Sequence, residues 1–444
     1  MRDMTKGSAR EHLWKYALPI LLGNWFQLAY NAIDSAIAGR FIGKDALAAE
    51  GVAGPLMNLV ILAISGLCIG TGVLMSEYFG AKDLKKFRQS LGTTLSVGTV
   101  LSVIVSLIFV VIMPYILQAM AVPQEIFEIT VIYLRIIFMG MPFTFIFNAL
   151  SSGLKSAGDS KTPLKYLAFS SILNAGLDLV FLGIFHFGIV CSALTTTIAE
   201  VVSAFLVMYY THKKFPELFP GKQDWKADPE LLKKIIGYGA PAAIQQAVQP
   251  IGKVLIQSQV NALGVTTIAA FNAVTRVDDF ACIPEQGISA AISTFIAQNR
   301  GADKKERIRP GFRTGLKLEV SYWLIIGSIT ALFGKNIVSL FVAGEGAKEV
   351  IEIGTRYLMY MAIFYLWPAM TNGFQGFYRG MGKMYTTIIG TTLQISIRTI
   401  VTYLLAPRMG IVGIAIACAI GWSAMLIFEI PYYFITIRKQ SLPK

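Results

Sequence analysis

Long hydrophobic stretches recur along the chain and are separated by short polar segments. Each is about twenty residues long or longer, which is enough for a helix to cross a bilayer. We expect helices over the ranges 13–41, 47–76, 90–113, 128–152, 164–185, 189–211, 232–260, 266–297, 314–338, 350–377, 385–405 and 411–437. Because backbone polar groups in hydrocarbon must be paired within the segment, the pattern predicts an all-α membrane protein with twelve transmembrane helices.

Composition supports a membrane protein. The chain is 55% hydrophobic and 15% charged, with a mean hydropathy of +0.59, whereas soluble domains carry roughly 25% charged residues. The net charge of +13 would suit a nucleic-acid-binding protein. The basic residues instead gather on one side of the predicted spans, in both termini, the central linker and the loops 82–88 and 300–317. The positive-inside rule therefore explains the charge, excludes a nucleic-acid partner and places both termini in the cytoplasm.

The longest polar segment, from Thr211 to Pro229, divides the chain near its midpoint. We expect an amino-terminal six-helix lobe at 1–211, a cytoplasmic linker at 212–231 and a carboxy-terminal six-helix lobe at 232–444. The halves resemble each other at an offset of about 221–224 residues, as in Gly80-Ala81 with Gly301-Ala302 and Tyr133-Leu134 with Tyr357-Leu358. This predicts a parallel pseudo-twofold repeat, which is typical of transporters with two lobes around a central cavity.

The first predicted span contains a carboxylate, Asp34, well inside its length. A charged side chain in hydrocarbon costs at least a few kcal/mol, so it is kept where it faces a protein interior or a wet cavity. Tyr30 lies one turn before Asp34, and Gln27 lies seven residues before it, so the three share a helix face. Asn31 completes the polar stretch. We interpret this face as part of a site for a coupling ion.

A second carboxylate, Asp178, lies in the fifth predicted span, one turn after Asn174. At 1.5 Å per residue, Asp34, Asp178 and Thr196 of the sixth span all lie about 10 to 12 Å from the same membrane surface. An oxygen-rich set of this kind suits a hard cation such as Na⁺. Alternatively, two nearby carboxylates make a proton carrier. The sequence leaves both readings open.

Several motifs follow one another along the whole chain: Gln27-x-x-Tyr30-Asn31-x-x-Asp34-x-x-x-x-Gly39, Gly43-x-x-Ala46-Leu47-Ala48-Ala49, Gly80-Ala81, Asn174-x-x-x-Asp178, Ala193-Leu194-x-Thr196 and Gln298-Asn299-x-Gly301-Ala302. In this order they resemble the multidrug and toxic compound extrusion (MATE) transporters of bacteria. The resemblance implies an antiporter that exports amphipathic, often cationic compounds by alternating access in exchange for H⁺ or Na⁺. It also implies that Asp34, Asn174, Asp178 and Thr196 form the ion site.

Some members of that family hold a second carboxylate site in the carboxy-terminal lobe, formed by the seventh, eighth and tenth spans. The seventh span of this chain offers Gln245, Gln246, Gln249 and Lys253 instead, and the tenth has no acid in its interior. We therefore expect the ion site in the amino-terminal lobe alone.

A charged cluster lies within the eighth predicted span, formed by Arg276, Asp278, Asp279 and Glu285. Arg276 is expected to pair with Asp279 or Asp278, and Lys253 with Glu285 or Asp278. The cluster is either a charge-balanced contact between helices or part of a substrate-binding or gating surface. The candidates for the second role are Lys253, Arg276, Asp279, Glu285, Gln245, Gln249 and Trp367.

Other functions receive less support. A flippase for a lipid-linked saccharide is the main alternative, because Lys253 and Arg276 would give it basic residues in a central cavity. An enzyme is not expected, since no Ser–His or Cys–His pair and no nucleotide-binding motif lies in the spans. The four cysteines have no metal-ligand spacing, so no zinc site, disulfide or other cofactor is expected. The expected partners are small-molecule substrates and the lipid bilayer, with the chain a monomer in the inner membrane.

Overall fold

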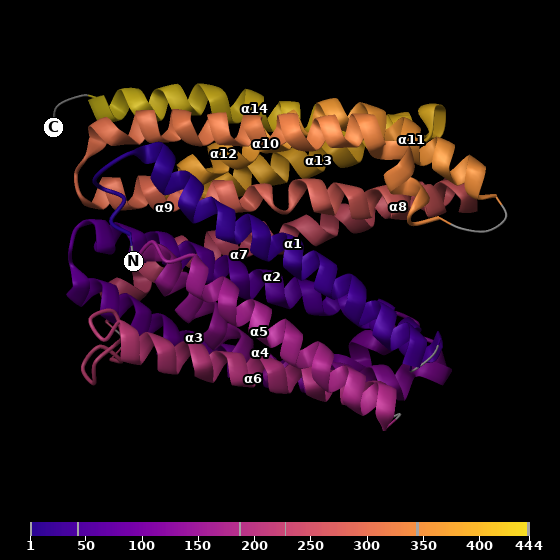
Figure 1. The fold of residues 1–444 in the computed structure, drawn as a ribbon, viewed down its shortest axis with the longest axis horizontal. Coiled ribbons are helices and arrows are strands. Elements are labelled where there is room, and N and C mark those ends of the chain that lie inside the picture. The colour runs from indigo at the N-terminus through magenta and orange to yellow at the C-terminus, as the bar shows by residue number, and fades with distance from the viewer. Residues whose placement is uncertain (1, 42–43, 186–187, 227, 343–345, 442–444) are drawn as a thin grey trace. The chain divides into compact units, whose positions relative to one another are not determined.

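A computed structural model of the chain describes residues 2–41, 44–185, 188–226, 228–342 and 346–441 (Figure 1). The side chains of 33–41, 44–47 and 438–441 lie outside this description. Within the described ranges, every regular element is a helix. The predicted all-α class is therefore confirmed.

The helices of the first half begin and end as follows: α1 Ala9–Phe41, α2 Lys44–Gly80, α3 Leu84–Ala119, α4 Gln124–Ser156, α5 Lys161–Asp178, the π-helix η1 Leu179–Ile184, and α6 Ile189–Lys214. Those of the second half are α7 Pro229–Ala262, α8 Val265–Cys282, α9 Glu285–Gly301, α10 Lys305–Ser339, α11 Ala347–Phe364, α12 Leu366–Gly380, α13 Met384–Met409 and α14 Ile411–Ser441.

Three predicted spans are each divided into two elements. The span 266–297 breaks between α8 and α9 next to Pro284, and the span 350–377 breaks between α11 and α12, shortly before Pro368. Proline removes a backbone donor and disturbs the preceding turn, which accounts for breaks at these points. The span 164–185 changes from α-helix to π-helix directly after Asp178.

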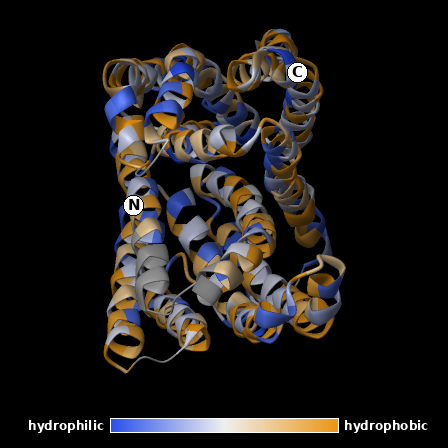
Figure 2. Ribbon diagram, turned by 90° about the vertical axis from the view of Figure 1, so that its right-hand side faces the viewer, coloured by the Kyte–Doolittle hydropathy of each residue, from blue (hydrophilic) through white to orange (hydrophobic). Residues whose placement is uncertain are grey.

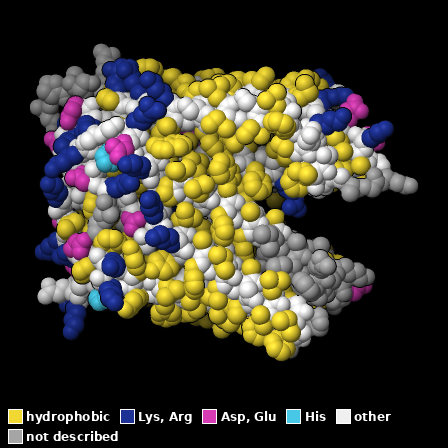
Figure 3. Space-filling view, in the orientation of Figure 1, with side chains coloured by type: hydrophobic (Ala, Val, Ile, Leu, Met, Phe, Trp, Pro, Cys, Tyr) yellow, Lys and Arg dark blue, Asp and Glu magenta, His cyan; other side chains and the backbone are white. Residues whose placement is uncertain are grey.

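The chain is a multi-pass membrane protein. Among the described residues, nine helical segments are long and apolar enough to cross a membrane. Hydrophobic residues predominate along the helices in Figure 2. In Figure 3, hydrophobic side chains cover the middle of the visible face of each unit, while Lys and Arg gather toward the helix ends. The count of twelve spans and the internal repeat stay predictions.

The chain forms two compact units. The amino-terminal unit contains residues 1–3 and 22–247, and the carboxy-terminal unit contains residues 4–21 and 248–444. Two helices therefore contribute to both units, because α1 is divided after Leu21 and α7 after Ala247. The predicted lobes at 1–211 and 232–444 stay a prediction.

In the amino-terminal unit, the first part of α7 packs closely against α2. A β-carbon at Gly66 would lie 2.5 Å from the carbonyl oxygen of Ala242, and one at Gly70 would lie 2.1 Å from that of Tyr238. Only glycine permits this approach of two helix backbones. The Tyr238 hydroxyl also donates to Oε2 of Glu77 at 3.3 Å.

In the carboxy-terminal unit, the first part of α1 packs against α9. The Tyr16 hydroxyl lies 3.1 Å from Oγ1 of Thr294, and a β-carbon at Gly287 would lie 3.1 Å from the backbone nitrogen of Leu21. On its other side, α9 approaches α12, where a β-carbon at Gly376 would lie 2.5 Å from the Ser289 carbonyl oxygen. Close packing at small residues is typical of membrane helices.

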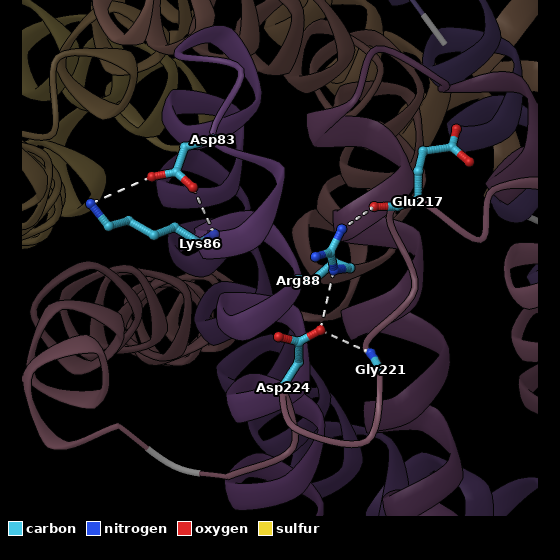
Figure 4. A network of polar contacts seen from close by, with 6 residues as sticks. All are labelled: Asp83, Lys86, Arg88, Glu217, Gly221 and Asp224. Atoms are coloured by element: carbon cyan, nitrogen blue, oxygen red, sulfur yellow. Dashed lines mark hydrogen bonds and ion pairs between the residues drawn. The ribbon is translucent and has the colours of Figure 1, made fainter.

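The linker after α6 is bound to the first turns of α3 (Figure 4). Arg88 Nε lies 3.2 Å from Oδ2 of Asp224, and Arg88 also donates to the carbonyl oxygen of Glu217 at 3.2 Å. The same Asp224 oxygen accepts from the backbone of Gly221 at 2.9 Å. These contacts fix the path of the polar segment that the sequence marks as the midpoint of the chain.

Candidate cation site

The candidate site lies between α5 and α6 of the amino-terminal unit. Asp159, the residue before the N-cap Ser160, accepts hydrogen bonds from the backbones of Lys161 and Thr162, each at 3.1 Å, and so satisfies the first free N–H groups of α5. The α-helix ends at Asp178, where η1 begins. Single π-turns inside helices occur frequently at functional sites because they redirect side chains.

Asn174 joins three helices. Its side chain is 2% exposed, and its Nδ2 donates to Oγ1 of Thr196 on α6 at 3.3 Å. Its Oδ1 accepts a hydrogen bond from the hydroxyl of Tyr30 on α1. The structure thus brings together three of the residues singled out in the sequence, one each from the first, fifth and sixth predicted spans.

Asp178 is fully buried and is held by a residue that the sequence analysis missed. Oγ1 of Thr195 lies 2.5 Å from Oδ1 of Asp178 and 2.8 Å from the carbonyl oxygen of Ser192. Asp178 is 0% exposed and Thr195 is 1% exposed. In the sequence, the run Thr195-Thr196-Thr197 indicates that a threonine hydroxyl of α6 could contact Asp178. Periodicity alone does not say which of the three hydroxyls faces α5.

The side chain of Asp34 lies outside the described residues, so its place in the site stays a prediction. The α1 backbone continues as a helix through this position, one turn beyond Tyr30. The side chains of Gln27 and Asn31, on the same stretch, are exposed. Among the described side chains, the site therefore offers one carboxylate, one amide and three hydroxyls.

In the carboxy-terminal unit, the predicted pairing of charges is wrong. Nζ of Lys253 lies 2.9 Å from Oδ1 of Asp279, and the two side chains are 64% and 33% exposed. Asp278 instead accepts hydrogen bonds from the hydroxyls of Tyr357 at 2.8 Å and Tyr365 at 2.6 Å. Arg276 is exposed, and none of the ion pairs among described residues includes it. Tyrosine hydroxyls thus replace the expected basic partner of Asp278.

The other substrate or gating candidates occupy different environments. Glu285 is 1% exposed, and its Oε2 accepts from Nδ2 of Asn372 at 3.2 Å. Gln245 is 5% exposed, whereas Gln249 is exposed. The Trp367 indole donates to Oγ of Ser423 at 2.7 Å and packs edge-on against the Phe364 ring, with centroids 5.7 Å apart. Trp367 thereby contributes to contacts between α12 and its neighbours.

Two buried glutamates of this unit were not singled out from the sequence. Glu319 on α10 and Glu429 on α14 are both 0% exposed. Oε1 of Glu429 accepts from Nε2 of Gln375 at 2.5 Å. A lone acid inside a hydrophobic stretch was the signal for both.

Comparison with known proteins places the chain among transporters. The family model described as MatE matches residues 19–180 and 241–404. The probable multidrug resistance protein YoeA of Bacillus subtilis (strain 168) is 28% identical over 99% of this chain and 98% of its own length. The probable multidrug resistance protein YpnP of the same organism is 28% identical over 87% of this chain and 86% of its own length.

Among solved structures, the chain resembles an outward-facing multidrug resistance MATE family transporter of the MOP superfamily. The TM-score is 0.93, with 20% sequence identity over 99% of this chain and 98% of the other. At this identity the likeness shows the fold.

Proposed function

The chain belongs to the MatE family, and on this premise we propose that it is a secondary active antiporter that exports amphipathic, often cationic small molecules in exchange for H⁺ or Na⁺ by alternating access. The relatives are named as multidrug resistance proteins. They are membrane transporters and not enzymes, in keeping with the MatE match. The observation that carries the proposal is the fully buried carboxylate of Asp178, held by Thr195 at the junction of α5 and η1.

A fully buried carboxylate requires a proton or a cation, because its charge is costly in a low-dielectric interior. Asp178 supplies a carboxylate oxygen, and Asn174 and Thr196 supply an amide and a hydroxyl oxygen. We propose that Asp34 adds the second carboxylate and that Gln27, Tyr30 and Asn31 line its approach. Loading one small cation here would neutralise the site and favour the state in which it is closed.

For the substrate, we propose the small-molecule drugs that the relatives' names indicate. The flippase alternative needs unpaired basic residues facing a lipid-linked anion, and Lys253 is instead bound to Asp279. We further propose that the protein is a monomer of the inner membrane, has both termini in the cytoplasm and needs no cofactor besides the coupling ion. The distribution of Lys and Arg supports this orientation.

Purified protein in liposomes tests the proposal. Efflux of a fluorescent cation is measured under a pH gradient and, separately, under a Na⁺ gradient. We expect one gradient to drive efflux, and Asp178→Asn and Asp34→Asn to abolish it. The control is Asp303→Asn, which removes an exposed carboxylate near Lys305. Wild-type efflux by Asp178→Asn would overturn the proposal.

A further inference from the structure

Three basic side chains form a row near the start of α10, in the carboxy-terminal unit. Arg309, Arg313 and Lys317 follow one another at intervals of four residues, and all three are exposed. Residues four apart lie one turn apart on the same face of a helix, so the row is about 12 Å long at 1.5 Å per residue. No acidic residue lies between positions 307 and 318. This α10 basic row therefore presents a concentrated positive charge.

Other basic residues close by hold the protein together, and the α10 basic row does not. Lys304 and Arg307 donate to backbone carbonyl oxygens of the amino-terminal segment at 2.9 and 2.8 Å. None of the ion pairs in the described part of the chain includes a residue of the row. In Figure 3, Lys and Arg side chains gather at the end of this unit where α10 begins. The charge of the row is therefore available to a ligand.

An aromatic contact between α10 and α14 lies beside the row. The ring of Phe312, next to Arg313, packs against the ring of Tyr433 of α14, with centroids 5.0 Å apart. Tyr433 is 8% exposed, and Phe434, which follows it, is 62% exposed. Tyrosine is enriched where membrane proteins meet the headgroups of the bilayer, because its ring is apolar and its hydroxyl is polar. The contact thus places the row at the level of the lipid headgroups.

Beyond the row, the same face of α10 becomes hydrophobic. Leu324 lies seven residues after Lys317 and is 53% exposed, and Leu332 lies fifteen residues after it and is 76% exposed. The helix rise places them about 10 and 22 Å further along. A positive band followed by an apolar band is complementary to a molecule that has an anionic head and a hydrocarbon tail. A small soluble anion would match the first band alone.

We propose that the α10 basic row binds an anionic phospholipid, with the lipid phosphate on the row and an acyl chain along Leu324 and Leu332. Arginine suits this role because its planar guanidinium donates two parallel hydrogen bonds to a phosphate. Phosphatidylglycerol brings a net negative charge, whereas the choline of phosphatidylcholine cancels the charge of its phosphate. The site goes beyond the proposed function, because it shares no residue with the candidate cation site and binds lipid whether or not the protein transports.

Native mass spectrometry of the purified full-length protein tests this site. Dioleoyl phosphatidylglycerol or dioleoyl phosphatidylcholine is added in detergent, and the lipids that remain bound are counted as the lipid concentration varies. We expect phosphatidylglycerol to bind more tightly. Each of Arg309→Gln, Arg313→Gln and Lys317→Gln should weaken its tightest binding by roughly fivefold, and the triple variant should lose it.

The matched control removes the same charge from the other end of the unit. It combines Lys335→Gln, Lys348→Gln and Arg408→Gln, which alter three exposed basic residues near the end of α10, the start of α11 and the end of α13. This variant should keep the tightly bound phosphatidylglycerol, because its substitutions lie away from the row.

Three results would overturn the proposal. The first is equal binding of the two lipids by the wild type, and the second is equal loss of phosphatidylglycerol in the two triple variants. The third is displacement of the bound lipid by glycerol 3-phosphate, which would show a site for a soluble anion. If the triple variant of the row does not fold, Arg313→Gln alone decides the matter, because unchanged phosphatidylglycerol binding in this variant also overturns the proposal.

Discussion

The Thr195 hydroxyl oxygen lies 2.5 Å from Oδ1 of Asp178 and 2.8 Å from the carbonyl oxygen of Ser192. A hydroxyl has one hydrogen to donate, so these two acceptors compete for it. An ionised Asp178 attracts the hydrogen, and a protonated or cation-bound Asp178 releases it to Ser192. If the proposed function is correct, we expect the direction of this hydroxyl to change when the site binds its ion.

This relationship predicts the effect of Thr195→Ala. A hydrogen bond to a charged group contributes about 1.5–3 kcal/mol, which corresponds to roughly a 13- to 160-fold change in an equilibrium constant. We expect the variant to change the half-maximal concentration of the coupling ion for efflux by an amount in this range. Thr195→Ser keeps the hydroxyl and should restore the wild-type value. Equal effects of the two variants would show that the methyl group matters and the hydroxyl does not.

The Tyr30–Asn174–Thr196 contacts predict non-additive substitutions. Tyr30→Phe removes the donor to Oδ1 of Asn174, and Thr196→Val removes the acceptor of its Nδ2. Each should weaken ion-dependent efflux by roughly 1 kcal/mol, or about fivefold. In Asn174→Ala both contacts are already lost, so adding Tyr30→Phe should have little further effect. A double-mutant cycle on efflux rates measures this. Strict additivity would contradict the contact network.

The linker contacts in Figure 4 predict a local change in protease resistance. Arg88 and Asp224 are 31% and 11% exposed at their side chains, so their ion pair is partly shielded from water. Arg88→Ala should detach the segment 216–226 and speed its cleavage in limited proteolysis. Lys86→Ala is the control, because its pair with Asp83, the N-cap residue of α3, is more exposed and does not involve the linker. Exposed pairs of this kind contribute little. Similar cleavage rates for both variants would argue against the role of Arg88.

The amino-terminal residues predict a change in thermal stability. The backbone nitrogen of Met4 donates to Oε1 of Gln298 at 2.9 Å, and its carbonyl oxygen accepts from Nδ2 of Asn299 at 3.2 Å. Met4 is 0% exposed. Asn299→Ala should lower the unfolding free energy by about 1–3 kcal/mol, because it removes a donor to the Met4 carbonyl oxygen and the side-chain oxygen that accepts from Nε of Arg307 at 2.9 Å. Thermal melting in detergent measures it, with the exposed Asn336→Ala as the control. An unchanged melting temperature would show that these bonds do not hold the segment.

Most of the helical architecture follows from hydrophobic length. Apart from the internal breaks, most observed helices begin and end within about four residues of the predicted ranges, whereas α3 extends six residues further at each end and α10 begins nine residues earlier. The fixed helix rise predicted that Asp178 and Thr196 lie at a similar depth, with Asn174 one turn away, and in the structure Thr196 contacts Asn174 while Asp178 contacts Thr195. The sequence did not distinguish Thr195 from its neighbours, since one residue rotates a side chain by about 100° and the facing of α6 is set by packing.

The partner of Lys253 was predicted wrongly for a different reason. A long flexible side chain reaches several acids on the next helix, and the choice depends on the relative register of α7 and α8. Asp278 instead accepts hydrogen bonds from Tyr357 of α11 and from Tyr365, which lies between α11 and α12, about eighty residues further along the chain. Such long-range register is not encoded in local periodicity.

The division of α1 and α7 between the two units bears on how the polypeptide can be cut. A break in the linker would leave the first fragment with the end of α1 that packs on α9, and the second with the end of α7 that packs on α2. Neither fragment alone contains every helix of a finished unit. Function would therefore be restored only if both fragments were synthesised together. The first fragment would then supply the start of α1 to the carboxy-terminal unit, and the second would supply the start of α7 to the amino-terminal unit.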